Sequence, residues 1–228
     1  MNLFSYVLDA ANWSGADGIG RLLLEHLYYT AISVAAAALL AIPLGILIGH
    51  TGRGSFLVIG TSNAARAIPS LGLLVLVVLM LGTGVFPIIL VLAVLAIPPI
   101  LTATAAGIHG ADREAVHAAR ALGMTPGQMV KRVEWPLALP LVISGLRSAT
   151  LQVVATATVA AFAAGGALGR LLISGQRTNN YSQMFAGAVL VALLAIVLDV
   201  VLGAMGWTAA RRVRPKSRSM KEAVLRPA

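Results

Sequence analysis

The 228-residue sequence contains no cysteine and few charged residues. Without cysteine the chain forms no disulfide bond and offers no thiolate ligand to a metal ion. Charged residues make up 11% of the sequence and hydrophobic residues 58%, and the mean hydropathy is +0.89. These proportions exclude an ordinary soluble protein and are typical of an integral membrane protein.

Acidic residues are scarce too, because eight Asp and Glu accompany 17 Lys and Arg, which gives a net charge of +9. A basic protein of this kind can bind nucleic acid, but here the basic residues gather beside hydrophobic segments, as they do on the cytoplasmic side of membrane proteins. We therefore expect membrane lipid and no nucleic acid as a partner. Four lie in a central polar segment and seven after Trp207, namely Arg113, Arg120, Lys131, Arg132, Arg211, Arg212, Arg214, Lys216, Arg218, Lys221 and Arg226.

Several familiar motifs are missing. No basic segment precedes a short apolar stretch at the start, so we expect the first hydrophobic span to be retained. No G-x-x-x-x-G-K-S/T occurs, and the glycine-rich 165–169 stretch predicts only a flexible turn at the membrane edge. The four His lack the H-x-x-x-H and H-E-x-x-H spacings. The sequence thus predicts no catalytic residue, no metal site and no ATP hydrolysis by this chain, and argues against a membrane-embedded enzyme.

Hydrophobic segments define the architecture. Five are long enough to cross a bilayer, at about residues 27–49, 56–81, 85–108, 141–164 and 183–207. The sequence therefore predicts an all-α, polytopic membrane protein with about five transmembrane helices within residues 27–207. Residues 1–26 are expected to be a weakly structured segment outside the cell, and residues 208–228 a basic cytoplasmic tail. The distribution of Lys and Arg places the central loop, residues 109–136, inside the cell and the N-terminus outside.

Polar side chains inside the predicted spans are candidates for a substrate path, because in a bilayer they must face protein or water. Asn63 and Ser70 lie in the second span and Thr156 and Thr158 in the fourth. Small residues around the two threonines favour either close helix packing or a narrow polar path, and both interpretations stay open. Asp199, in the fifth span, is either a functional acid or a structural one, paired with Arg147 or Arg66 or kept neutral.

The central loop has the pattern of two short helices. Small residues including Ala115, Ala118 and Ala119 share one helical face, and Gly123 suits a left-handed position at its end. Thr125-Pro126-Gly127-Gln128 then supplies an N-cap, a first-turn proline and a capping Gln, and Pro136 and Pro140 are expected to bound the second helix. Helices this short and this charged lie beside the membrane, where they either dock a partner or merely connect two spans.

The loop resembles the cytoplasmic coupling loop of binding-protein-dependent ABC importer permeases, whose pattern is E-A-A, three residues, G, nine residues, I-x-L-P. When Gly123 is aligned, His117, Ala118 and Ala119 take the E-A-A positions and 133–136, ending at Pro136, takes the I-x-L-P positions. His117 stands where the family has Glu, and Glu114 lies one turn earlier. Segments 68–71, 145–150, 165–169 and 193–199 further resemble permeases of osmoprotectant importers, which move glycine betaine, carnitine or choline.

The resemblance implies a type I importer fold in the cytoplasmic (inner) membrane of a bacterium or archaeon, and a defined set of partners. These are a second permease, identical or related, cytoplasmic ATPase subunits that bind ATP and Mg, and an extracytoplasmic substrate-binding protein. It implies a docking role for Glu114, His117, Ala118, Ala119, Gly123 and Pro136, and we expect Asn63, Ser70, Thr156, Thr158 and Asp199 at the substrate path. A permease for methionine, sulfonate or another small solute is the alternative, followed by a stand-alone secondary transporter.

Overall fold

The computed structural model describes residues 4–15, 17–54, 67–164 and 166–213, together with Phe56 and Gly60. Only helices and turns occur in these segments, which confirms the all-α prediction. The helices are α1 (Ser5–Leu8), the 3-10 helix η1 (Ala10–Trp13), α2 (Ile19–Thr51), α4 (Ser70–Leu81), α5 (Val85–His109), α6 (Arg113–Ala121), α7 (Pro126–Met129), the π-helix η2 (Val130–Glu134), α8 (Trp135–Ala164), α9 (Gly169–Arg177) and α10 (Tyr181–Val213).

Within the described residues, four helical segments are long and apolar enough to cross a membrane. They are α2, α5, the continuous stretch Pro126–Ala163 that ends in α8, and Tyr181–Arg211 of α10. Of the predicted second span, residues 56–81, the structure describes the 12-residue helix α4, and most of what precedes it lies outside the described residues. Asn63 belongs to that part, so its place at the substrate path stays a prediction.

The N-terminal part is more ordered than the sequence predicts. The side chain of Asp9 caps η1, and the indole N–H of Trp13 donates a hydrogen bond to the carbonyl of Val7 at 2.7 Å. Helix α2 begins at Ile19 rather than near residue 27, because Ile19 and Leu22 are buried in a cluster with side chains of α9 and α10. The prediction of a weakly structured segment up to residue 26 is therefore wrong.

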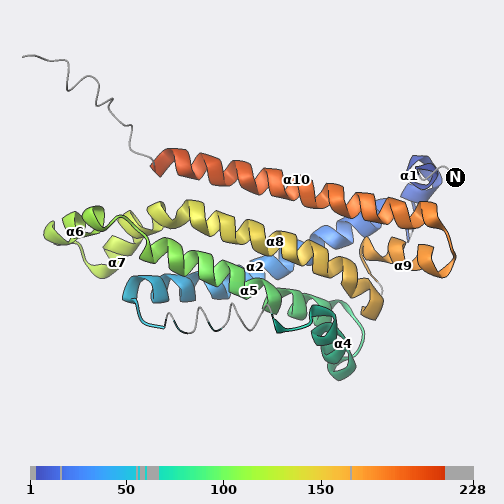
Figure 1. Cartoon of the computed structure of the whole chain (residues 1–228), viewed down its shortest axis with the longest axis horizontal. Coiled ribbons are helices and arrows are strands. Elements are labelled where there is room, and N and C mark those ends of the chain that lie inside the picture. Colours follow the sequence, from blue (N-terminus) through green and yellow to red (C-terminus); the bar gives the residue numbers. More distant parts are fainter. Residues whose placement is uncertain are drawn as a thin grey trace, which may run out of the picture.

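The four long segments form an elongated bundle. Figure 1 shows α2, α5 and α10 running in one direction and α8 in the other. The closest packing follows chain order, with α2 on α5, α5 on α8 and α8 on α10. Helices α6 and α7 lie at the same end of the bundle as the end of α10, and α1 and α9 lie at the opposite end. The central loop and the end of α10 therefore lie at the same end of the bundle, as the charge distribution predicts.

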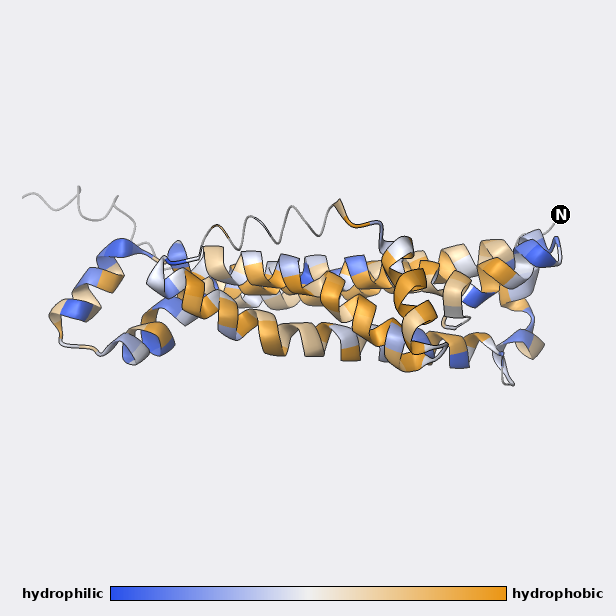
Figure 2. Cartoon of the chain, turned by 90° about the horizontal axis from the view of Figure 1, so that it is seen from below, coloured by the Kyte–Doolittle hydropathy of each residue, from blue (hydrophilic) through white to orange (hydrophobic). Residues whose placement is uncertain are grey.

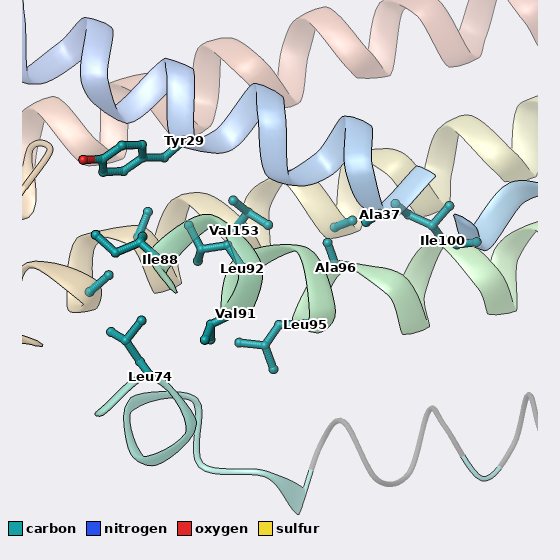
Figure 3. Packing of buried hydrophobic residues seen from close by; sticks show 14 of the residues in the cluster. Tyr29, Ala37, Leu74, Ile88, Val91, Leu92, Leu95, Ala96, Ile100 and Val153 are labelled. Carbon is teal, nitrogen blue, oxygen red and sulfur yellow. The ribbon is translucent and has the colours of Figure 1, made fainter. Parts of the chain in front are cut away.

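Small residues bring the helices together. A stripe of buried small side chains runs along α2 at four-residue spacing, made of Ser33, Ala37, Ala41, Gly45 and Gly49. It packs against α5, whose larger side chains fill the core seen in Figure 3 together with residues of α4 and α8. A membrane offers no hydrophobic gain for burying one apolar helix on another, so close backbone approach and dispersion contacts hold the bundle together.

Apolar side chains also cover the outside of the bundle. Figure 2 shows hydrophobic residues along its length and hydrophilic ones gathered at its two ends. Large hydrophobic side chains stand exposed on α10, including Leu193, Ile196, Val197 and Val200. Exposed apolar surface of this extent is typical of a protein that faces lipid.

The glycine-rich stretch after α8 is packed rather than flexible. Gly165 is outside the described residues, but Ala167 and Leu168 are fully buried. The Ala167 N–H donates a hydrogen bond to Oε2 of Glu25 at 3.2 Å, and a Cβ at Gly169 would collide with the carbonyl of Thr158. The following helix α9 buries Leu171 and Ile173. The predicted turn is present at Ala167 and Leu168, but it is packed rather than loose, because these residues fill the space between α2, α8 and α10.

We predict that Gly49→Val lowers the stability of the bundle. A Cβ at this position would lie 2.7 Å from the carbonyl oxygen of Ala105 and 2.7 Å from Cβ of Ile108, so α2 and α5 must move apart. Overpacking of this kind costs about 1–3 kcal/mol. Thermal unfolding in detergent, followed by fluorescence-detected size exclusion, measures the effect. Gly72→Val is the control, since its Cβ meets only Pro69 Cβ, at 3.6 Å. Equal melting temperatures for the two variants would contradict the prediction.

Candidate functional site

The central loop begins with a well-capped helix. Helix α5 ends at His109, and the side chain of Asp112 then accepts hydrogen bonds from the backbone N–H groups of Glu114, at 2.8 Å, and Ala115, at 3.4 Å. An acidic N-cap satisfies two of the free donors at the start of α6 and lies favourably at the positive end of the helix dipole. The structure thus forms the first short helix that the sequence predicts.

The reversal after α6 also follows the sequence prediction. Gly123 has φ +78°, in the left-handed region that a side chain disfavours. Thr125 and Gln128 form a complete capping box, in which the threonine hydroxyl accepts from the backbone of Gln128 and the glutamine side chain accepts from the backbone of Thr125. Pro126 opens α7, where its missing N–H costs nothing. Local chemistry alone therefore fixes this helix–turn–helix.

The second short helix does not end where the sequence predicts. Helix α7 continues through the π-helix η2 into α8, so Pro136 and Pro140 lie inside one continuous helix from Pro126 to Ala163. The backbone N–H of Trp135 donates to the carbonyl of Val130, five residues back. This wider turn changes the hydrogen-bond register just before Pro136, so the proline joins the helix instead of ending it. The prediction that the prolines bound the second helix is wrong.

Helix α6 has three faces with different surroundings. Ala119 is buried against the bundle, whereas Glu114, Ala118 and Leu122 are exposed on the outer side. His117 is also exposed, but it lies on a third face, together with Arg113 and Arg120. Of the predicted docking residues, Glu114 and Ala118 are therefore available to a partner, Ala119 positions the helix, Gly123 forms the turn, and Pro136 lies half-buried in α8.

A side-chain hydrogen bond that the sequence analysis missed joins the loop to the bundle. Nδ1 of His50, at the end of α2, lies 2.8 Å from Oε2 of Glu134 in η2. Glu134 is 6% exposed, so the imidazole is the partner that compensates for its burial. The two residues are 84 positions apart, and no local pattern reveals their contact.

A groove of about 640 Å³, lined by apolar residues and a few polar side chains, lies between α5 and α8. Its polar side chains are Thr102, Ser144, Ser148 and Gln152, and among the described residues no charged side chain lines it. The three residues on α8 are four positions apart and share one helical face. Gly145 allows the approach of α5, because a Cβ there would lie 3.0 Å from the carbonyl oxygen of Pro99. The groove offers hydroxyl and amide groups to a solute at the depth of the spans.

The predicted path residues lie elsewhere. The hydroxyl of Thr156 is bonded to the carbonyl of Gln152 at 2.9 Å and that of Thr158 to the carbonyl of Val154 at 3.0 Å, and Thr156 is 9% exposed. Neither lines the groove, and Ser70 is half-buried at the start of α4. Their roles stay predictions. Polar residues at four-residue spacing in the fourth span, here Ser144, Ser148 and Gln152, are the sequence signal that indicates the groove-lining face.

Asp199 has the partner that the sequence suggested. The guanidinium of Arg147 on α8 binds both carboxylate oxygens of Asp199 on α10 in a fork-like arrangement. Such a bidentate pair neutralises two charges within the spans. Both side chains remain partly exposed, at 45% and 28%, beside the face of α8 that carries the groove. Arg66, the other suggested partner, lies outside the described residues.

Metal ligands do not gather in the described part of the chain, where no group of three or more His, Asp or Glu side chains is placed to hold an ion. The charged groups are instead used in pairs, as at His50 and Glu134 or at Arg147 and Asp199. The candidate site therefore consists of a groove between α5 and α8 and a capped loop at one end of the bundle.

Comparison with known proteins gives consistent matches. A family model described as "Binding-protein-dependent transport system inner membrane component" matches residues 41–214. The chain is 35% identical to the Bacillus subtilis glycine betaine/carnitine/choline transport system permease protein OpuCB, over 87% of this chain and 90% of the relative. It is 36% identical to the choline transport system permease protein OpuBB of the same organism, over 78% of this chain and 82% of the relative. The inward-facing MetNI methionine ABC transporter shares the fold, with a TM-score of 0.74 and 24% identity over 84% of this chain and 95% of that one.

We predict that the Arg147–Asp199 pair stabilises the packing of α8 on α10 only while both charges are present. Arg147→Leu leaves a carboxylate unpaired among membrane-spanning helices and Asp199→Leu leaves a guanidinium unpaired, so each single variant is expected to lose folded yield. The double variant Arg147→Leu/Asp199→Leu is expected to recover most of it. Monodisperse yield in detergent is the measurement. A double variant as poor as the sum of the two single variants would contradict this account.

Proposed function

Because the chain belongs to the family of binding-protein-dependent transport system inner membrane components, we propose that it is the transmembrane subunit of an ATP-driven importer that moves an osmoprotectant such as glycine betaine, carnitine, choline or proline betaine. Two such subunits surround the solute path, and the chain itself is not catalytic. The second copy is either identical or a related permease. Cytoplasmic ATPase subunits bind ATP and Mg, and an extracytoplasmic protein delivers the solute.

The observation that carries this proposal is the continuity of the helix from Pro126 to Ala163. Its first turns form the docking loop, and its later turns carry Ser144, Ser148 and Gln152 on the groove. A displacement of the loop by a partner therefore moves the groove-lining helix directly, without a flexible connection between them. An importer needs this link, because ATP hydrolysis outside the membrane must change the shape of a path inside it.

Sequence identity to known permeases favours an osmoprotectant over methionine as the solute. The permeases for glycine betaine, carnitine or choline share 35–36% identity with the chain, whereas the methionine transporter shares 24% and supports the fold alone. The chemistry of the groove agrees with this choice. These solutes carry a fixed cation and often a carboxylate, and a lining of hydroxyl and amide dipoles passes both groups without trapping either, whereas a charged lining would hold one of them.

The test of this function is ATP-dependent uptake by the reconstituted importer. We predict that Ser148→Trp reduces glycine betaine uptake at least about tenfold, because an indole side chain occupies the groove between α5 and α8. A tenfold change in rate corresponds to about 1.4 kcal/mol. Leu193→Trp, at an exposed position on α10, is the matched control and is expected to retain uptake. ATPase binding and protein yield are measured for both. If neither variant lowers uptake while wild-type vesicles transport, the groove is not the path, and if wild-type vesicles transport no osmoprotectant with ATP, the function itself is wrong.

We further propose that the docking loop faces the cytoplasm of a bacterial or archaeal cell. In a chain with no native cysteine, Lys131→Cys reports on the loop end of the bundle and Tyr181→Cys on the opposite end, and both side chains are exposed. A membrane-impermeant maleimide is expected to label position 181 in intact cells and position 131 only in inside-out vesicles. Labelling of position 131 from outside intact cells would reverse the orientation.

A further inference from the structure

A recess with an excess of positive charge lies between α6 and the bundle. Its volume is about 320 Å³, and the ends of α2 and α5, helix α6 and η2 surround it. The ionisable side chains that line it are Arg113, His117 and Arg120 from α6, His50 from α2, His109 from α5 and Glu134 from η2. None of these takes part in the α5–α8 groove. The recess is therefore a second site, separate from the solute path.

The charges in this recess are not balanced. Among the described residues, Glu134 is the one carboxylate that lines it, and that carboxylate is already bound to His50 at 2.8 Å. No ion pair joins Arg113 or Arg120 to a carboxylate within the described segments. Two guanidinium groups thus stand unpaired beside the imidazoles of His109 and His117, which add N–H donors. Positive charges in a concave site reinforce one another and concentrate the field on whatever anion enters.

The basic side chains belong to the helix that the proposed function assigns to docking. Arg113, His117 and Arg120 are spaced by four and three residues and form one row along α6. Figure 1 shows α6 beyond the ends of α5 and α8, at the tip of the bundle, and Figure 2 shows hydrophilic residues gathered at that end. Arg113, His117 and Arg120 are all exposed, so the row is open to a partner that approaches the tip.

The sign of the charge in this row differs from the coupling-loop pattern. The first position of the E-A-A motif, acidic in the pattern, is His117 here, and Arg113 and Arg120 flank it one turn away on either side. A partner surface that suits an acidic residue at this position would repel this helix. The docking partner must instead carry acidic groups, because like charges brought together at an interface repel each other.

We propose that the recess formed by Arg113, His117 and Arg120 receives one or more Asp or Glu side chains from the cytoplasmic ATPase subunit. This inference rests on the proposed function and adds the charge of the partner's contact surface to it. Each inserted carboxylate forms a charge-assisted, fork-like pair with a guanidinium, an arrangement for which arginine is well suited. The phosphate of an anionic lipid has related chemistry, but the place of the row on the tip helix, past the apolar turns of the spans, favours the protein partner.

The test measures binding of the ATPase subunit encoded in the same genome to the permease in nanodiscs of phosphatidylcholine, a lipid without net charge. The variant pair Arg113→Glu/Arg120→Glu is compared with Arg53→Glu/Arg211→Glu, which makes the same change of charge on exposed residues near the ends of α2 and α10, outside both the recess and the docking loop. The recess variant is expected to raise Kd at least about tenfold and to reduce the dependence of Kd on KCl, whereas the control shifts Kd by less than about threefold. Arg113→Gln/Arg120→Gln, which adds no repulsion, is expected to fall between wild type and the charge reversal.

Reciprocal substitutions identify the contact. An Asp→Arg or Glu→Arg change in the ATPase that restores binding to the recess variant, while weakening binding to wild type, supports the proposal, as does recovery of ATP-driven uptake by the same pair. Equal loss in the recess and control variants, or no loss in either, overturns it. Binding that depends on the recess only in nanodiscs with phosphatidylglycerol assigns the recess to lipid and also overturns it. A wild-type chain that binds no ATPase at any salt concentration contradicts the proposed function as well.

Discussion

The close approach of α2, α5 and α8 is the constraint on which the rest of the structure depends. In lipid, helices gain little from covering apolar surface, so they stay together only where their backbones come near enough for dispersion contacts to accumulate. The stripe from Ser33 to Gly49 on α2 and Gly145 on α8 permit this approach. The same approach places α5 along one side of the face of α8 that carries Ser144, Ser148 and Gln152. The groove lies where these two helices meet.

Features governed by neighbouring residues were predictable from the sequence. The turn at Gly123 and the capping box of Thr125 and Gln128 are set by hydrogen bonds within three residues, and the structure contains both. The spans near residues 85–108 and 141–164 were also predictable, from hydropathy, because a bilayer imposes a minimum apolar length on any crossing helix. The bidentate pair of Arg147 and Asp199 was among the suggested partnerships, since charges at that depth require neutralisation.

Features governed by contacts between distant segments were not predictable. Ile19 and Leu22 extend α2 because α9 and α10 cover them, and Ala167 and Leu168 are buried for the same reason. Pro136 was expected to end a helix. The π-turn before it shifts the backbone hydrogen-bond pattern so that the helix continues through the proline, and helix propensities do not predict such a turn. Thr156 lies in a segment of small and hydroxyl residues that suits a path, but its hydroxyl donates to the backbone carbonyl of Gln152. Ser148 lines the groove instead, and nothing in the sequence distinguishes it from the other serines.

The π-helix η2 connects the two sites physically. A π-turn is less stable than an α-turn and persists where surrounding contacts support it. Here the support is the pair of His50 and Glu134, which fastens η2 to the end of α2 on the wall of the basic recess. A partner that occupies the recess therefore acts on the same segment that begins the groove-lining helix. Because η2 runs without a break into α8, the recess and the groove are joined by one continuous helix.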